Sequence, residues 1–187
     1  GRFHSNQYLT LHSAIYRTEI IRQSGIVLPK HIFYEDNLFV YAPLPLTKKL
    51  IYMNEDLYRY LIGREGQSVS EKVMMKRCTH QIEIAQRIFD MHDLKVILRE
   101  NPKLGRYMYH EACFMLVIAT VFTRLNRTEE AEQKVRDMWA HCMKTDPIIA
   151  RKMRRNFLNL SVNLPGSFGR GIGLKGYWLA HKIVQFN

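Results

Sequence analysis

Residues 74–89, with the sequence MMKRCTHQIEIAQRIF, decide the fold class of the larger part of this chain. Apolar side chains recur there at Met74, Cys78, Ile82, Ala85 and Phe89, in steps of 4, 4, 3 and 4 residues. This spacing follows the α-helical period of about 3.6 residues, so it predicts one helix with a buried face.

The helical period continues towards the C-terminus. We expect a helix over residues 104–125 and another over 128–144, in which Thr128 caps a first turn rich in Glu. Pro147 suits the first position of a fourth helix, because the N–H that proline lacks would have no partner there. The inner face of the helix over 128–144 comprises Ala131, Val135, Met138 or Trp139, and Cys142. Residues 71–187 are therefore predicted to form an all-α helical bundle.

Residues 1–70 have a different pattern, in which short strand-like and helix-like stretches alternate. Residues 8–12 are β-prone, residues 14–23 indicate a helix that Ser13 could cap and that stops at Gly25, residues 33–41 indicate a second helix, and residues 50–62 indicate one or two strands. This predicts an α/β part with too few strands for a complete sheet domain. The expected fold is an α/β part (1–70) followed by the helical bundle (71–187), mostly helical overall.

The charge of the chain is uneven. The 187 residues carry a formal +11, of which residues 1–70 contribute +2 and residues 71–187 contribute +9. Such a basic excess indicates an acidic partner, such as an anionic lipid surface, a nucleoside diphosphate or a nucleic acid. Three widely spaced cysteines favour neither disulfides nor a zinc site, which fits a reducing cytoplasm. The first residues lack an initiator Met and the features of a signal peptide, so we expect the chain to start inside a longer protein.

Two stretches of the first part could carry chemistry. Phe33-Tyr34-Glu35-Asp36-Asn37 places two carboxylates at a helix start, which would keep them ionised. One of them could be a general base, although Asp36 or Asn37 could equally be a helix cap. Residues 63–70 combine two glycines with Arg64, Ser68 and Ser70 in a possible phosphate cradle. The alternative there is a capping box formed by Ser68 and Glu71.

The C-terminal residues offer weaker signals. Gly171-x-Gly-x-x-Gly176 lacks the preceding strand and the following acidic residue of a dinucleotide site, so a flexible joint is the better interpretation. Residues 147–187 contain seven basic residues, several aromatic residues and no Asp or Glu. This composition suits an anionic membrane surface or a nucleic-acid backbone, and equally a solvated basic face of the bundle. The eight histidines are scattered without metal-ligand spacing.

The order of motifs in the first part resembles the acceptor-side half of family 2 glycosyltransferases. These motifs are His12-Ser13-Ala14-Ile15-Tyr16-Arg17, then Gly25-Ile26, then residues 33–39 with Glu35-Asp36, then Tyr58-Arg59-Tyr60, and then Gly63-Arg64-x-Gly-Gln67-Ser68-Val69-Ser70. The resemblance covers roughly residues 5–75. Members of this family are inverting enzymes of GT-A fold that build bacterial surface polysaccharides.

The resemblance implies a role for each matching residue. Asp36, next to Glu35, would be the general base that deprotonates the acceptor hydroxyl. Arg64, Gln67 and Ser68 would bind the diphosphate of the donor, and His12 and Ser13 would lie near the donor sugar and acceptor. A divalent metal, Mg²⁺ or Mn²⁺, is expected only with the N-terminal half of such an enzyme, because this chain has no Asp-x-Asp motif and would bind no metal itself.

The implied partners are a nucleotide-sugar donor and a saccharide or lipid-linked acceptor. The protein would be cytoplasmic and peripheral at the inner face of the membrane, through residues 147–187, and the isolated chain would be inactive. Nucleic acid is the less favoured partner of this enzyme, and a homo-oligomer is possible. The alternative function is a basic helical binding module for nucleic acid or anionic membrane, without catalysis.

Overall fold

A computed structural model describes residues 8–61 and 66–163 of the chain. About 66% of these described residues are helical, and none of them forms a strand. The elements are η1 (Leu11–Ser13), α1 (Thr18–Ser24), α2 (Asp36–Tyr41), η2 (Leu44–Leu46), α3 (Glu71–Lys76), α4 (Cys78–Met91), α5 (Leu94–Glu100), α6 (Pro102–Arg124), α7 (Glu129–Thr145), α8 (Pro147–Arg154) and α9 (Phe157–Val162), where η marks a 3₁₀-helix.

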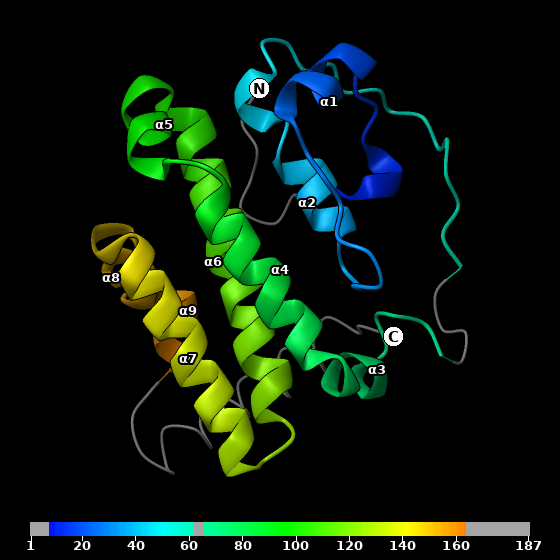
Figure 1. The fold of residues 1–187 in the computed structure, drawn as a ribbon. Coiled ribbons are helices and arrows are strands. Elements are labelled where there is room, and N and C mark those ends of the chain that lie inside the picture. Colours follow the sequence, from blue (N-terminus) through cyan, green and yellow to red (C-terminus); the bar gives the residue numbers. More distant parts are fainter. Residues whose placement is uncertain (1–7, 62–65, 164–187) are drawn as a thin grey trace.

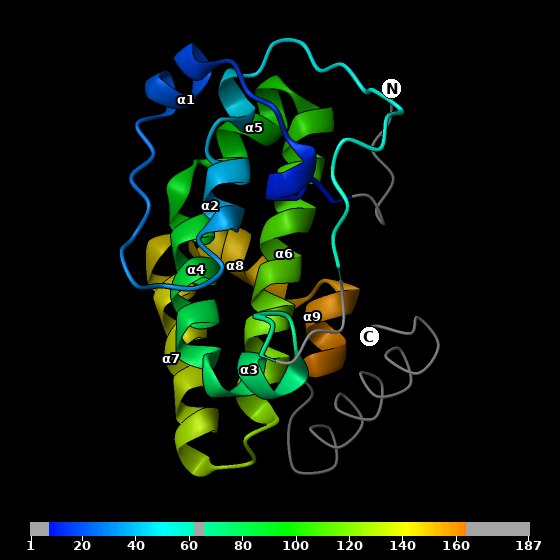
Figure 2. The same cartoon turned by 90° about the vertical axis from the view of Figure 1, so that its right-hand side faces the viewer.

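The helices lie in three layers (Figure 1). The long helices α4 and α6 pack side by side in the middle. Helices α7, α8 and α9 cover one side of this pair, and η1, α1 and α2 lie on the other side. Figure 2, a quarter turn away, shows the first elements of the chain in front of α4 and α6.

One apolar core joins the three layers. Its centre is α6, whose Met108 and Leu116 are fully buried against Ile84 and Ile88 of α4 and Met138 of α7. The same core includes three side chains of the first part of the chain, namely Leu38, Tyr41 and Leu44. The helices of the second part therefore supply most of the buried surface on which α2 rests.

Local sequence explains where several helices begin. The Thr128 hydroxyl accepts a hydrogen bond from the Ala131 N–H (3.1 Å), as predicted for the cap of α7. Pro147 is the first residue of α8, also as predicted, and the Asp146 carboxylate caps that helix. Gly25 ends α1 with a φ of +63°, a conformation that glycine adopts without strain. The predicted inner face of α7 is buried at Ala131, Val135, Met138, Trp139 and Cys142.

The α/β prediction for the first part is wrong, and so is the GT-A fragment implied by the resemblance, because the described residues contain no sheet. Residues 50–61 are extended, as a strand would be, but they run alone along the surface (Figure 1). Their apolar side chains are exposed, and Ile51 and Tyr52 retain 85% and 80% of their accessible surface. A strand requires a neighbouring strand for its N–H and C=O groups, and the described part of the chain offers none. The prediction of one or two strands over residues 50–62 is therefore wrong for residues 50–61, which the structure describes.

Some helix bounds also differ from the prediction. The helix expected around residues 74–89 is interrupted at Arg77, which leaves the helical conformation (φ −107°, ψ 26°) and separates α3 from α4. The helix expected at 14–23 begins at Thr18 without a side-chain cap, because Ser13 instead ends η1. Helices α5 and α9, of seven and six residues, were too short to be separated by period alone. The predicted Gly-rich joint at residues 171–176 lies outside the described residues.

Candidate functional site

The start of α2 holds the two carboxylates of the Glu35-Asp36 motif. Tyr34 precedes them with a φ of +72°, which is a strained conformation for a bulky side chain. The Asn37 amide donates to the Tyr34 carbonyl oxygen (2.9 Å) and to Asp36 Oδ1 (3.2 Å), so it fixes the turn and one carboxylate oxygen. Glu35 and Asp36 therefore follow the strained turn at the N-terminal end of α2.

Asp36 has an altered acidity. Its carboxylate is exposed at the surface, but neighbouring protein atoms remove part of its hydration, and this raises the pKa of Asp36 above its usual value. The negative charge of Glu35 raises this pKa further, while hydrogen bonds from Asn37 and a positive charge on His12 lower it. A carboxylate with a raised pKa is a better proton acceptor than a fully hydrated one.

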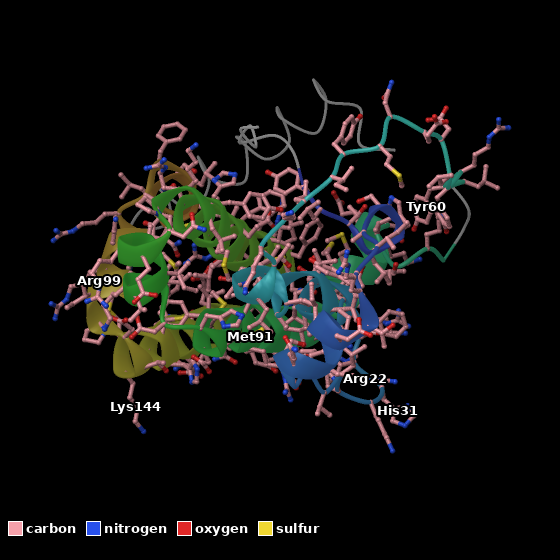
Figure 3. The ribbon with its side chains drawn as sticks, turned by 90° about the horizontal axis from the view of Figure 1, so that it is seen from above. Arg22, His31, Tyr60, Met91, Arg99 and Lys144 are labelled. Atoms are coloured by element: carbon pink, nitrogen blue, oxygen red, sulfur yellow. The ribbon has the colours of Figure 1, made fainter. Side chains whose placement is uncertain are left out.

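His12 lies against the extended segment. Its ring stacks on Tyr58 (centroids 5.0 Å apart, planes at 26°) and on Tyr60 (5.4 Å, 7°). The two tyrosines share one face because they are two residues apart in an extended segment. Tyr60 and its segment lie at the outer edge of the molecule, on the opposite side from Arg99 of α5 (Figure 3). The result is an exposed aromatic surface beside the start of α2.

Ser13 has a structural role next to His12. Its Oγ donates to the Thr10 carbonyl oxygen (3.0 Å) and accepts from the Thr10 N–H (3.1 Å). These bonds close the turn of η1 and hold His12 in position. The predicted cap of a helix at 14–23 is therefore replaced by a turn that positions His12.

Ser68 is connected to Tyr34, and Gln67 is connected to the end of the extended segment. The Tyr34 hydroxyl donates to the Ser68 carbonyl oxygen (2.9 Å), which ties residue 68 to the turn before Asp36. The Gln67 amide donates to the Leu61 carbonyl oxygen (2.7 Å), at the end of the extended segment. The capping-box alternative for Ser68 is wrong, because the residue before α3 is Ser70, which makes no side-chain cap. Arg64 lies outside the described residues.

The structure thus brings His12 and Glu35 close to Asp36, and both influence its pKa. Ser68 contacts the Tyr34 side chain through its backbone carbonyl oxygen, whereas the Gln67 side chain bonds to Leu61. The sequence did not indicate that Tyr58 and Tyr60 would stack on a histidine of a distant segment. The spacing of two residues between Tyr58 and Tyr60 indicated that they share one face. It did not indicate which residue packs on that face.

The described part of the chain offers neither a cluster of metal ligands nor a membrane-spanning helix. Residues 8–61 and 66–163 contain no group of three or more His, Cys, Asp or Glu side chains that could hold a metal ion. No helix in those ranges is long and apolar enough to cross a membrane.

Comparison of the chain with protein-family models, with curated proteins and with solved structures gives no match. The assignment of a function therefore depends on the geometry of the site and on the motifs that it contains.

Proposed function

We propose that this chain supplies the acceptor side of an inverting glycosyl transfer, with Asp36 as the general base. The observation that carries the proposal is the proximity of distant motifs near the start of α2. His12 lies close enough to Asp36 to influence the pKa of that carboxylate, and its ring stacks on Tyr58 and Tyr60. The Tyr34 hydroxyl, from the residue before Glu35, donates to the Ser68 carbonyl oxygen.

The chemistry follows from the arrangement. Asp36 would accept the proton of an acceptor hydroxyl while that oxygen attacks the anomeric carbon of a nucleotide sugar. The bond from the anomeric carbon to the diphosphate breaks on the opposite face, which inverts the configuration. The raised pKa of Asp36 suits this proton transfer, and the exposed rings of Tyr58 and Tyr60 offer an apolar surface for a sugar ring.

The diphosphate would leave towards residues 64–68. Arg64 supplies a cation and Ser68 a hydroxyl at that place in the sequence, and both stabilise negative charge on the leaving group. The donor nucleotide and any divalent metal would be held by polypeptide outside this chain, because this sequence has no Asp-x-Asp motif.

We also propose a cytoplasmic location at the inner face of the membrane, where lipid-linked acceptors are found. The support is compositional, since residues 147–187 carry seven basic residues and no acidic one.

The test replaces Asp36 by Asn in the complete protein that contains this chain. Transfer from radiolabelled nucleotide sugars to saccharide and lipid-linked acceptors is measured with Mg²⁺ or Mn²⁺ present. Loss of a general base is expected to lower kcat by about 10²–10⁴-fold with little change in KM, because ground-state binding is retained.

Asp137→Asn is the matched control, since Asp137 is an exposed carboxylate on α7, in the layer on the other side of α4 and α6. It should keep full activity. Near-normal turnover of the Asp36→Asn enzyme would show that Asp36 is not the base. Absence of transfer by the wild-type protein from every nucleotide sugar tried would count against the function itself.

A further inference from the structure

An open pocket of about 620 Å³ lies between α6, α8 and α9, away from the Asp36 site. Its walls are Tyr109 of α6, Ile148, Arg151 and Lys152 of α8, and Arg155 and Asn156 at the junction with α9. Helices α8 and α9 lie on the side of α6 opposite to α2 (Figure 1). The pocket is thus a separate feature of the helical layers.

Three cations line this pocket without a carboxylate. Arg151 and Arg155 are four residues apart, so they lie on one face of the same helical turn, and Lys152 is their neighbour. Within residues 8–61 and 66–163, none of the three forms an ion pair, and no acidic residue lines the pocket. Like charges at this spacing repel each other, and a bound anion would remove that repulsion.

The remaining walls add neutral donors and an apolar surface. The Lys152 ammonium lies 5.2 Å from the centroid of the Tyr109 ring, which keeps the Lys152 stem along the wall of the pocket. Burial is the main cause that raises the pKa of Tyr109, and its hydroxyl interacts with the Asn156 side chain, so it remains a neutral O–H group at physiological pH. Ile148 is 63% exposed at the rim.

We infer that this pocket binds a phosphate group, carried by a soluble phosphate compound or by a lipid head group. Two guanidinium groups and one ammonium group around one cavity match the charge and the oxygen geometry of a phosphate. A phosphomonoester or a diphosphate has more oxygens and more negative charge than a carboxylate, so it suits three cations better. The pocket shares no residue with the Asp36 site, but its three cations are among the basic residues 147–187 on which the proposed membrane location rests.

The experiment compares two double variants that remove equal charge. Arg151→Gln with Arg155→Gln removes two cations from the pocket, while Lys48→Gln with Lys49→Gln removes two exposed cations from the first part of the chain. Binding of inorganic pyrophosphate is measured by calorimetry at low salt, where exposed charges are least screened. Sedimentation with phosphatidylcholine vesicles, with and without phosphatidic acid, tests the lipid source.

We expect the wild-type protein to bind pyrophosphate saturably. The pocket variant should raise the Kd about tenfold or more, and the control should raise it less than about twofold. If pyrophosphate does not bind, but the pocket variant loses more binding to phosphatidic acid vesicles than the control does, the site is supported and its phosphate is assigned to a lipid. Equal losses in the two variants, or no binding of either probe by the wild type, would overturn the inference.

The replaced arginines are exposed, so the fold should survive, and circular dichroism checks it. If the double variant unfolds, the single change Lys152→Gln takes its place and is compared with Lys48→Gln.

Discussion

Replacing Glu111 by Gln should raise the free energy of unfolding relative to wild type more at about pH 8 than at about pH 5. Glu111 of α6 lies where the first part of the chain meets α6, beside Leu9, Val40 and Leu44. Burial raises the pKa of Glu111 from 4.5 to about 7, although the Tyr107 hydroxyl bonds to its carboxylate and lowers the pKa somewhat. One carboxylate oxygen, Oε1, is buried without a hydrogen-bond partner.

The sign of the pH effect follows from proton binding. Between pH 4.5 and about 7 the folded protein holds a proton on Glu111 that the unfolded chain has released. Glu111 therefore contributes fully to the free energy of unfolding below the pKa of the unfolded chain. This contribution is lost as the pH rises through the pKa of the folded protein. Each pKa unit corresponds to about 1.4 kcal/mol, so ionised Glu111 costs the fold at most about 3 kcal/mol at pH 8.

Urea unfolding followed by circular dichroism, at about pH 5 and about pH 8, measures the effect. Glutamine has the same shape and stays neutral. The free energy of unfolding of Glu111→Gln, relative to that of wild type, should therefore increase by about 1–3 kcal/mol from pH 5 to pH 8. The comparison cancels the titration of the histidines, which both proteins share. Glu100→Gln, at an exposed site, is the control and should show no such change. A difference between wild type and Glu111→Gln that is the same at both pH values would refute the reasoning.

The helix packing carries three other predictions. A Cβ at Gly105 would lie 2.6 Å from the backbone Cα of Leu98. Gly105→Ala should therefore lower the free energy of unfolding by about 1–3 kcal/mol in urea titrations, and an unchanged value would contradict this close approach. The Arg124–Glu132 pair (3.0 Å) is only 12% and 15% exposed, and Arg124 also donates to the Val162 carbonyl oxygen, so Arg124→Met should cost about 3 kcal/mol. Arg87→Met, which breaks the exposed pair with Glu83, should cost less than about 0.5 kcal/mol in the same assay, and equal costs would show that burial is unimportant here. Burial raises the pKa of the Cys113 and Cys142 thiols to about 12, so mass spectrometry should find neither alkylated by iodoacetamide until urea unfolds the protein, and rapid labelling of the native protein would contradict their placement.

The helical part of the fold was predictable from sequence to a large extent. A buried helix face repeats at a fixed spacing, and the caps at Thr128 and Pro147 act within a few residues, so α4, α6, α7 and α8 could be placed. The short helices α5 and α9 were missed because one or two turns do not define a period. The interruption at Arg77 was also missed, since Met74 and Cys78 keep the apolar spacing across it.

The candidate site was predicted less completely. Glu35 and Asp36 were identified from their position at a helix start, and His12 and Ser68 from motif order. Sequence did not indicate that Tyr34 would take a positive φ and bond to Ser68, because a strained turn exists only where tertiary contacts hold it. It also gave no sign that Glu111 would be buried at the junction with the first part of the chain.

The sequence by itself determined the longer helices of the second part and their apolar faces, because these depend on the spacing of neighbours along the chain. Only the tertiary structure decided whether the extended residues 50–61 form a sheet, which segments meet at Asp36, and that the cations of α8 surround one pocket with Tyr109. Pairing of strands, desolvation of a carboxylate and the packing of Tyr109 against α8 all depend on groups distant in sequence. Their positions are fixed only when the core around α6 has packed.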